Sequence, residues 1–481
     1  MDKFSQLQNI IPAHKVLLTD EAVRPYECDG LPAYKQRPGA VVLPDTIDEI
    51  KAVLCFCHKN QIPVIPRGAG TGLSGGALPR EDGVLLSLAK FKQILNIDPK
   101  ARTATLQPGV RNLAISQAAA AFNLYYAPDP SSQIACTIGG NVAENSGGVH
   151  CLKYGLTTHN ILQLKMLTMD GELLTIGGEA LDSSGYDLLA LMTGSEGLLG
   201  IIIEITVKLL IKPPHVKVLL ASFDEVALAG QAVADIIGSG IIPAGLEMMD
   251  NAALCAAEDF VKVGYPKGAA AILLCELDGN ENEVNLQVKR VQNLLTQAGA
   301  TEIRVAQTEQ ERMQFWAGRK NAFPAVGRIS PDYYCMDGTI PRKHLPEVLE
   351  GINQLSQHYN LPVVNVFHAG DGNLHPLILY DANQTGELEK AEELGGKILE
   401  LSVAHGGSIT GEHGVGIEKI NQMCVQFNSD ELTQFHAVKE AFDPDKLLNP
   451  GKAIPTLHRC AEFGALHVHD GQLPFPELER F

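Results

Sequence analysis

Two histidines and a later Glu-His pair are the residues of this chain best suited to chemistry. His368 and His375 flank a turn-forming run of glycine, aspartate and asparagine in the segment HAGDGNLH. Because such a turn folds the chain back, both imidazole rings can point at one place. Together with Glu412 from the later segment GEHG, they offer three ligands to a metal ion and leave coordination positions open, which is typical of a catalytic site. The neighbouring His413 is then available for proton transfer.

An alternative is that these histidines are hydrogen-bonded separately in ordinary loops, because a sequence cannot show whether side chains converge. The structure distinguishes the two interpretations by the positions of the rings.

Composition excludes several classes of protein. With 481 residues, 45% of them hydrophobic, the chain can bury a large core and should form two or more domains. The formal charge of −18 argues against nucleic-acid binding. The N-terminus lacks a secretory signal, and the most apolar stretch, 188–211, is interrupted by Glu196, Glu204 and glycines, so no membrane span is expected. Ten cysteines without framework or cluster spacing predict reduced cytosolic thiols and no iron–sulfur centre.

Hydrophobic periodicity divides the chain into two α+β regions. In residues 36–215, short strands are predicted at 41–44 and 62–66, a helix over 46–60, and a hairpin from 161–168 and 172–176. In residues 216–440, helices over 225–237 and 281–298 alternate with strands such as 271–277, which indicates a sheet covered by helices. Residues 441–481 read as a turn-rich return of the chain, and not as a third domain.

Two glycine-rich loops indicate a cofactor that contains a pyrophosphate. The first, PRGAGTGLSGG, follows a predicted strand, and its glycines allow the backbone N–H groups to approach phosphate oxygens. It contains a GxGxxG match, but a dinucleotide-binding turn must open a helix, whereas Gly76, Pro79 and Gly83 follow here. There is no Walker lysine. The second loop runs from PDPSS into TIGGNVAENSGG. Either loop alone could be a structural turn.

These motifs resemble a known family. The loops PRGAGTGLSGG and TIGGNVAENSGG, the run TGSEGLLG and the closing LNPGK are similar to the FAD-linked oxidases of the vanillyl-alcohol oxidase superfamily. HAGDGNLH and GEHGVG narrow the resemblance to the D-2-hydroxyacid dehydrogenase branch. CDGLPAYK near the start and the LPFPELERF tail extend it over nearly the whole chain.

The resemblance implies a fold and a domain order. An α+β chain is expected, with a two-subdomain FAD-binding domain of the vanillyl-alcohol oxidase (PCMH) type over 36–215 and an α+β cap domain with a central antiparallel sheet over 216–440. Residues 1–35 would pack on the flavin domain, and 441–481 would return to it.

The resemblance also implies the positions that contact the flavin. They are Arg67, Gly68, Ala69, Gly70, Thr71, Gly72, Ser74, Pro128, Thr137, Gly140, Asn141, Gly147, Ile202, Glu412 and Asn449. Thr71 occupies the place where some relatives carry a histidine bonded to FAD, so a non-covalent FAD is expected. Arg67 could instead brace its own loop.

For the reaction, the resemblance implies His368, His375 and Glu412 as ligands of one divalent ion: zinc, manganese or iron. His413 would contact the substrate as general base, and Arg319 would bind its carboxylate with two hydrogen bonds. Without the family, Arg319 reads as a helix-surface arginine in a salt bridge.

The implied substrate is a small 2-hydroxy acid such as glycolate or D-lactate. Phe323 and Cys335 stand where relatives acting on 2-hydroxyglutarate carry groups that hold a second carboxylate, and neither can pair with an anion.

The resemblance implies partner subunits as well, namely a second flavin-type subunit and an iron–sulfur subunit that passes electrons to quinone. The chain would then be cytoplasmic, peripheral on the inner membrane face through its partners, with the tail 457–481 as a candidate docking segment. A stand-alone D-lactate dehydrogenase and a non-catalytic flavin-binding scaffold are the alternatives.

Overall fold

The structure is a computed structural model that describes residues 3–180 and 185–456. The chain forms two compact units. The described part of unit 1 consists of residues 3–146, 156–180, 185–211 and 412–456, and unit 2 consists of residues 147–155 and 212–411. The domain boundaries expected from the sequence stay a prediction, because compact units of one chain are not a test of which parts fold independently. The tail 457–481, with its predicted docking segment and the LPFPELERF motif, lies outside the described residues.

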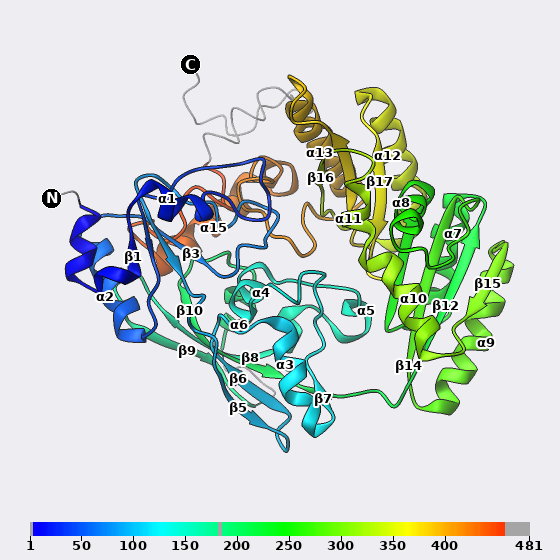
Figure 1. The fold of residues 1–481 in the computed structure, drawn as a ribbon, viewed down its shortest axis with the longest axis horizontal. Helices are drawn as coiled ribbons and strands as arrows, with labels where there is room; N and C mark the ends of the chain where they lie inside the picture. The colour runs from blue at the N-terminus through cyan, green and yellow to red at the C-terminus, as the bar shows by residue number, and fades with distance from the viewer. Residues whose placement is uncertain (1–2, 181–184, 457–481) are drawn as a thin grey trace. The chain divides into compact units, whose positions relative to one another are not determined.

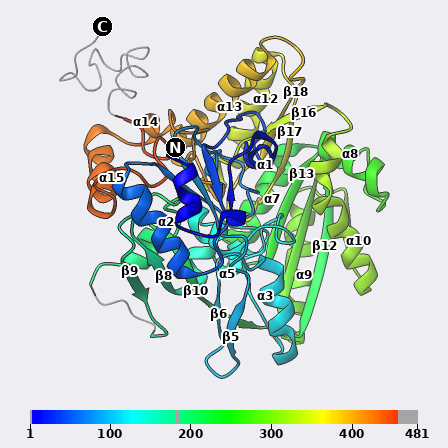
Figure 2. The same cartoon turned by 60° about the vertical axis from the view of Figure 1, so that its left-hand side comes forward.

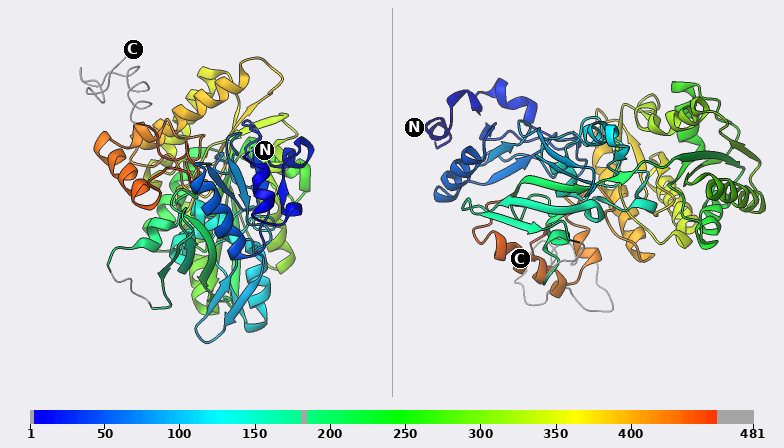
Figure 3. Two further views of the ribbon diagram at one scale, coloured as in Figure 1. Left: turned by 90° about the vertical axis from the view of Figure 1, so that its left-hand side faces the viewer. Right: turned by 90° about the horizontal axis from the view of Figure 1, so that it is seen from below.

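Unit 1 contains two main β-sheets (Figure 3). The first has the order β1-β2-β4-β3, in which β4 pairs in parallel with β2 and β3. Its strands are β1 (Val16–Leu17), β2 (Ala40–Val42), β3 (Val64–Arg67) and β4 (Val84–Ser87). The second sheet is antiparallel and has the order β5-β6-β10-β8-β9. Its strands are β5 (Ile94–Asp98), β6 (Thr103–Leu106), β8 (Ile161–Leu167), β9 (Leu173–Gly177) and β10 (Ile201–Lys208); β7 (Leu124–Tyr125) and β11 (Leu210–Ile211) pair separately.

The helices of unit 1 form where capping and periodicity agree. They are α1 (Asp20–Val23), α2 (Ile47–Lys59), α3 (Asn112–Ala119), α4 (Ile138–Glu144), α6 (Leu188–Met192), α14 (Met423–Gln426) and α15 (Ser429–Phe442). The hydroxyl of Thr46 accepts the amide hydrogen of Glu49 at the start of α2. One face of α2, with Ile50, Val53 and Leu54, packs in the core of the first sheet. The helix predicted over 46–60 is therefore confirmed.

The predicted hairpin around Asp170-Gly171 is also confirmed. Strands β8 and β9 pair up to Leu167 opposite Leu173, and Gly171 adopts φ +84°, a left-handed conformation suited to glycine.

Unit 2 is built on one seven-stranded sheet with the order β15-β12-β14-β13-β17-β18-β16, and every strand pair in it is antiparallel (Figure 1). Its strands are β12 (His215–Phe223), β13 (Gly245–Asp250), β14 (Ala271–Gly279), β15 (Glu302–Val305), β16 (Asp332–Cys335), β17 (Val363–Phe367) and β18 (Pro376–Tyr380). The central antiparallel sheet expected for this part of the chain is thus present.

Helices cover both faces of this sheet, and Figure 2 shows α9 and α10 on either side of β12. The helices of unit 2 are α5 (Cys151–Tyr154), α7 (Val226–Gly238), α8 (Asn251–Val261), α9 (Glu281–Gln297), α10 (Glu309–Lys320), α11 (Ala322–Val326), α12 (Leu345–Tyr359) and α13 (Glu387–Ala404). Side chains of α8, α10 and α11 form one core with alternate residues of the strands, among them Leu220, Leu274 and Val366. This face carries the candidate site described below.

Two expectations about the environment of the chain have different outcomes. No helix in the described ranges is both long and apolar enough to cross a bilayer. Eight cysteines of the described chain are free thiols, but Cys424 is disulfide-bonded. The expectation of reduced thiols is therefore wrong for Cys424, since spacing along the chain does not reveal which thiols meet in the fold.

Leu274→Ala should destabilise unit 2 by about 2–5 kcal/mol, because it removes a 1% exposed side chain from the core that also contains Trp316. Trp316 is the single tryptophan, so urea unfolding followed by its fluorescence reports on unit 2. Leu286→Ala on α9, where the side chain is 61% exposed, is the matched control and should change the free energy of unfolding by less than about 0.5 kcal/mol. Equal effects of the two substitutions would contradict the assignment of this core.

Candidate functional site

The segment HAGDGNLH connects β17 to β18 and closes on itself. The amide of His368 donates to the Asn373 carbonyl (3.1 Å), and the amide of Gly372 donates to the His368 carbonyl (3.2 Å). Gly372 has φ +84°, and a Cβ atom there would lie 2.2 Å from the backbone oxygen of Ile340, so both its conformation and its packing require glycine. The ring centroids of His368 and His375 lie 5.2 Å apart, with the planes at 86°. The predicted turn is therefore confirmed, and it brings the two imidazoles together.

Arg319 lies near the end of α10, on the side that faces the sheet. Trp316, one turn earlier, donates from Nε1 to a carboxylate oxygen of Glu276 (2.6 Å), which fixes the rotation of the helix. At Gly318 the helix approaches Tyr265 so closely that a Cβ atom would lie 2.2 Å from its ring. Arg319 is only 3% exposed, and this burial excludes the alternative of a helix-surface arginine.

Glu247 on β13 connects Arg319 to His368. Met248 pairs with Phe367, so the next position of the register places Glu247 opposite His368. Its Oε1 atom lies 2.8 Å from Nδ1 of His368, and its Oε2 atom lies 2.7 Å from a terminal nitrogen of Arg319. Glu247 was missed in the sequence. The single glutamate inside the apolar strand GLEMMD could have indicated it. A carboxylate that is buried in such a strand needs cationic or hydrogen-bonding partners.

Asp337 is a second carboxylate that the sequence did not reveal. It is fully buried after β16, and its carboxylate accepts hydrogen bonds from the hydroxyl of Thr410 (2.6 Å) and the amide of Gly411 (3.1 Å). Its Oδ1 atom lies 3.5 Å from Nε2 of His375. Of the described side chains of unit 2, Asp337 and His375 belong to a group whose donor atoms could hold a metal ion, whereas His368 is not part of that group. His368 as a metal ligand therefore stays a prediction. The chain leaves unit 2 directly after Gly411, with Glu412 and His413 as the next two residues.

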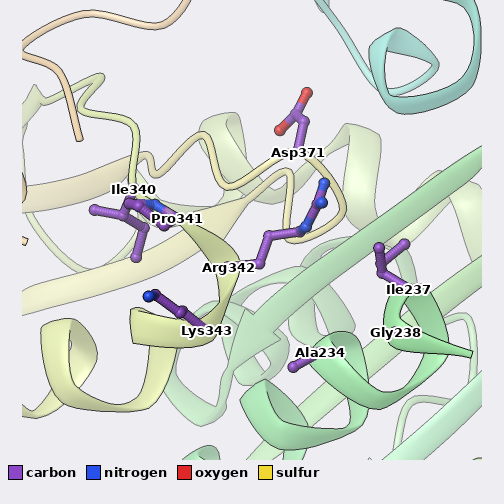
Figure 4. A pocket seen from close by; sticks show the side chains of 8 residues that line it. All are labelled: Ala234, Ile237, Gly238, Ile340, Pro341, Arg342, Lys343 and Asp371. Carbon is purple, nitrogen blue, oxygen red and sulfur yellow. The ribbon is translucent and has the colours of Figure 1, made fainter. Parts of the chain in front are cut away.

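A cavity of about 500 Å³ on unit 2 is distinct from these residues (Figure 4). It is lined by Ala234, Ile237, Gly238, Ile340, Pro341, Arg342, Lys343 and Asp371. Arg342 donates to the carbonyl of Gly370 (3.0 Å), so this side chain supports the histidine loop from outside. Asp371 of the histidine loop lines the cavity, but neither Arg319 nor the two loop histidines do, so the cavity is not the candidate site.

The first glycine loop lies in unit 1 and is braced by Arg67. The guanidinium donates to the Cys28 carbonyl (2.8 Å), and Gly70, with φ +71°, lies directly against it. The Gly72 carbonyl accepts the amide hydrogen of Gly30 (2.8 Å). Within the described chain no helix lies between β3 and β4, as expected for a loop that is not a Rossmann turn. Arg67 thus has the loop-bracing contacts of the alternative interpretation, and its contact with a flavin stays a prediction.

The first glycine loop meets the start of α4, a helix that occupies much of the second glycine-rich segment predicted as a loop, and buried hydroxyl groups there are unsatisfied. A Cβ atom at Gly68 would lie 2.4 Å from Oγ1 of Thr137 and 3.6 Å from the amide nitrogen of Gly140. Thr137 is 6% exposed and Ser74 is fully buried, yet within the described chain neither hydroxyl has a hydrogen-bond partner. Buried polar groups are normally satisfied, so this glycine-lined surface with two spare hydroxyls fits a polar ligand such as FAD.

Other predicted flavin positions have structural contacts. The side-chain amide of Asn141 donates to Asn112, which in turn donates to the carbonyl of Pro128, each at 2.9 Å. Ile202 is buried in β10, beside an irregularity of its pairing with β8. Ala69 is exposed. Gly147 begins the short segment of unit 2 that interrupts unit 1, and Glu412 begins the return of the chain to unit 1.

Asn449 supports the first glycine loop from behind. Its side-chain amide donates to the carbonyls of Gly76 (3.0 Å) and Glu196 (2.7 Å). Lys452 donates to the same Gly76 carbonyl (2.9 Å) and to the side chain of Asn449 (2.7 Å). Burial lowers the pKa of Lys452 to about 7. The closing motif LNPGK therefore fixes the loop, and a direct flavin contact of Asn449 stays a prediction.

The GEHGVG segment and the residue after it are anchored in unit 1 on Glu196 and on Ser74 of the first glycine loop. The carboxylate of Glu196 accepts the amide hydrogens of Val415 and Gly416, both at 2.7 Å, and the Ser74 carbonyl accepts that of Ile417 (3.0 Å). Burial raises the pKa of Glu196. Burial, reinforced by the negative charge of Glu196, also raises the pKa of Glu144 well above its usual range. The contact between Glu196 and the GEHGVG segment could have been suspected from the sequence, because Glu196 is a carboxylate that stands between the glycines of TGSEGLLG.

Comparison with known proteins identifies the family. Residues 38–177 match the FAD binding domain, and residues 212–453 match the C-terminal domain of the FAD linked oxidases. The chain belongs to the FAD-linked oxidases. It is thus a flavin-dependent oxidoreductase, and the resemblance to the vanillyl-alcohol oxidase superfamily seen in its motifs is confirmed.

Among similar sequences, glycolate oxidase subunit GlcD of Escherichia coli (strain K12) is 70% identical over 99% of this chain and 95% of the relative. The subunit of the same name from Bacillus subtilis (strain 168) is 40% identical over 89% of this chain and 91% of the relative. A D-lactate dehydrogenase of Anaerostipes hadrus is 33% identical over 94% of this chain and 96% of the relative.

Among solved structures, p-cresol methylhydroxylase has a TM-score of 0.80 at 16% identity, covering 95% of this chain and 97% of its own. An alkyldihydroxyacetonephosphate synthase has a TM-score of 0.74 at 18% identity, covering 94% and 86%. These two likenesses concern the fold alone. Together with the two matching family models, they confirm the predicted PCMH-type FAD-binding domain with an α+β cap domain.

Gly68→Ala should weaken FAD binding, because the added Cβ atom would lie 2.4 Å from the Thr137 hydroxyl in the surface where the loops meet. Overpacking of this kind costs about 1–3 kcal/mol, equivalent to about 5- to 150-fold weaker binding. The ratio of flavin to protein absorbance after dialysis measures it. Gly178→Ala, also in unit 1 but with no heavy atom within 4 Å of its Cβ position, should keep the wild-type ratio. Full flavin retention by both variants would contradict the assigned surface.

Proposed function

We propose that this chain oxidises a small 2-hydroxy acid, glycolate with D-lactate as a secondary substrate, to the 2-oxo acid. The observation that carries this proposal is the buried group in unit 2 that joins Arg319, Glu247, His368 and His375. In a 2-hydroxy acid the carboxylate and the hydroxyl stand on adjacent carbons. A guanidinium beside two imidazoles that bind a metal ion could recognise both groups at once. The names of the relatives, glycolate oxidase and D-lactate dehydrogenase, support the same substrate class.

Arg319 binds the substrate carboxylate in this proposal. Its side chain is 96% buried, and only one of its donor groups, a terminal nitrogen, faces Glu247. Its Nε atom has no hydrogen-bond partner in the described part of the chain. A guanidinium carries five N–H donors in a fixed plane, so donors remain for a carboxylate held by two parallel hydrogen bonds. A lysine at this position could not make that paired contact.

His368, His375 and Glu412 would hold a divalent ion, and His413 would accept the proton of the substrate hydroxyl. Two buried imidazoles and a carboxylate are a donor set that zinc, manganese and iron accept. Support comes from Gly411, whose amide bonds to Asp337 beside His375, since Glu412 and His413 directly follow it. When bound, FAD supplies the hydride acceptor, and a divalent ion lowers the pKa of the substrate hydroxyl.

The FAD would be bound without a covalent link, by the first loop from Arg67 to Gly72, by Ser74 and by Thr137 and Gly140 of the second loop. Support comes from the spare hydroxyls of Ser74 and Thr137 and from Thr71, which cannot form the histidine linkage of some relatives.

The surroundings of His375 favour a monocarboxylate. The ring of Phe323 meets that of His375 edge-on, with centroids 6.3 Å apart. Cys335 is 4% exposed, and its thiol donates to the Met336 carbonyl (3.4 Å). Neither side chain can pair with an anion, so a second carboxylate of the substrate would lose hydration without gaining a partner there. Glycolate and D-lactate avoid this penalty.

The proposed partners are the second flavin-type subunit and the iron–sulfur subunit of a glycolate oxidase complex, which would pass the electrons to quinone. The location would be cytoplasmic, peripheral on the inner face of the membrane through these subunits. Support comes from the relatives, which are named as subunits of glycolate oxidase.

The second candidate, a stand-alone D-lactate dehydrogenase, is favoured by the 33% identical relative of that name. Copurification of an iron–sulfur protein with the tagged chain would separate the two. A non-catalytic scaffold would not need the buried group around Glu247.

Anaerobic mixing of the flavin-loaded protein with glycolate should bleach the visible flavin absorbance, with slower bleaching by D-lactate. D-2-Hydroxyglutarate should react least, because no group near Phe323 and Cys335 pairs with its second carboxylate. Stopped-flow absorbance at the flavin maximum measures the three rates. Unchanged flavin absorbance with all three acids would refute the proposed activity.

His413→Ala should lower the rate of flavin reduction by glycolate about 10²–10⁴-fold, as expected for loss of a general base. The content of FAD and metal should stay near that of the wild type. His58→Ala, an exposed histidine of unit 1 that pairs with Asp445, serves as the control and should keep the wild-type rate. A normal rate in the His413 variant would remove this residue from proton transfer.

A further inference from the structure

Glu247 is a buried carboxylate that contacts two proposed functional side chains at the same time. It is 1% exposed. One oxygen lies 2.8 Å from Nδ1 of His368, and the other lies 2.7 Å from a terminal nitrogen of Arg319 and 3.0 Å from the same Nδ1 atom. Within the described chain, all polar contacts of this carboxylate go to these two residues. It caps no helix and bonds to no backbone group.

The position of Glu247 is fixed by the centre of the sheet. Strand β13 lies between β14 and β17 and pairs with both. Leu274 is its partner on β14, and His368 is the next residue of the β17 register. The carboxylate is therefore held by a backbone that is hydrogen-bonded on two sides. Its two partners come from two other elements, the end of α10 and the start of the HAGDGNLH turn.

Each contact of Glu247 restricts what its partner can do. A carboxylate at Nδ1 of His368 accepts the proton of that nitrogen, so the lone pair of the ring lies on Nε2, the atom through which an imidazole with such a partner binds metal. The ion pair with Arg319 holds one terminal nitrogen of the guanidinium beside the same carboxylate. One carboxylate therefore influences both the tautomer of His368 and the place of the Arg319 guanidinium.

We propose that Glu247 is a positioning residue that sets the separation between the guanidinium of Arg319 and the metal-binding imidazole of His368. The substrates that such a pair would bind are acids whose hydroxyl and carboxylate stand on adjacent carbons. The inference rests on the proposed function, because it assigns the carboxylate to Arg319 and the metal to His368. Both the guanidinium of Arg319 and the imidazole of His368 depend on the shared carboxylate for their position. Metal affinity and substrate affinity therefore depend on the same residue.

Glu247→Gln tests this inference. The substitution preserves the size of the side chain, but it removes the negative charge and replaces one of the two acceptor oxygens with a donor, so the side chain cannot accept from both partners. Metal affinity, measured by titrating Zn²⁺ or Mn²⁺ into metal-stripped protein, should fall about 10–100-fold, as for other carboxylates behind a metal-bound histidine. In the metal-saturated variant, the KM for glycolate should rise more than kcat falls, because Arg319 is displaced. Trp316 fluorescence during urea unfolding checks that the variant is folded.

Asp250→Asn is the matched control. Asp250 lies on the same strand, three residues from Glu247, but it caps α8 through Ala253 and bonds to Asn365. It should keep the metal affinity and KM of the wild type, even where stability falls. Should Glu247→Gln not fold, Glu247→Asp provides the second variant, since the shortened side chain cannot span both contacts, and it should weaken metal binding and raise KM as well.

A folded Glu247 variant with the metal affinity and the KM of the wild type would overturn the inference, while wild-type oxidation of glycolate would leave the proposed function intact. Absence of a metal from the wild-type protein would overturn it too, because His368 would then have no ion to bind. Failure of the wild type to oxidise any of the acids, with metal affinity still lost in Glu247→Gln, would instead refute the substrate assignment.

Discussion

A negative charge buried at the centre of the sheet in unit 2 constrains the residues around it. A carboxylate out of contact with water is strongly unfavourable unless cationic or hydrogen-donating groups surround it. At Glu247 these groups are Arg319 and His368. Each is held by its own element, Arg319 by a helix that Trp316 fixes through Glu276 and His368 by a turn that requires glycine at position 372. The need to compensate one charge thus brings together side chains from three elements distant in sequence.

Unit 1 has a different task, because it must hold an extended, polar cofactor against its backbone. Its two glycine loops come close where a side chain larger than hydrogen at Gly68 would collide with Thr137. The first loop is supported by Asn449 and Lys452, which both donate to the Gly76 carbonyl. The GEHGVG segment is anchored on Glu196 at Val415 and Gly416, while Gly411 is anchored on Asp337 in unit 2. Glu412 and His413 lie between these two anchor points in the chain.

Local signals in the sequence predicted much of this architecture. The helix over 46–60 followed from its periodicity and the Thr46 cap, and the glycines and asparagine of HAGDGNLH predicted the turn that brings His368 to His375. Glycines and a proline after the first loop correctly excluded a Rossmann turn. Spacing could not reveal pairings across strands. Glu247 is 121 residues from His368, and the register of β13 and β17 makes them neighbours. Asp337 is 73 residues from Thr410, and these two meet outside the strands. Arg319 could be found through the family resemblance alone, because its helix is polar in sequence and its burial depends on Glu276 and Tyr265.

In the proposed function, the group around Glu247 binds both a divalent ion and the carboxylate of a 2-hydroxy acid. Crystals grown with Mn²⁺ and glycolate, measured at a wavelength where manganese scatters anomalously, would locate both ligands. We expect an anomalous peak within bonding distance of Nε2 of His368 and of a ring nitrogen of His375, with the glycolate carboxylate on Arg319. A peak at a surface carboxylate instead, or glycolate bound away from Arg319, would contradict it.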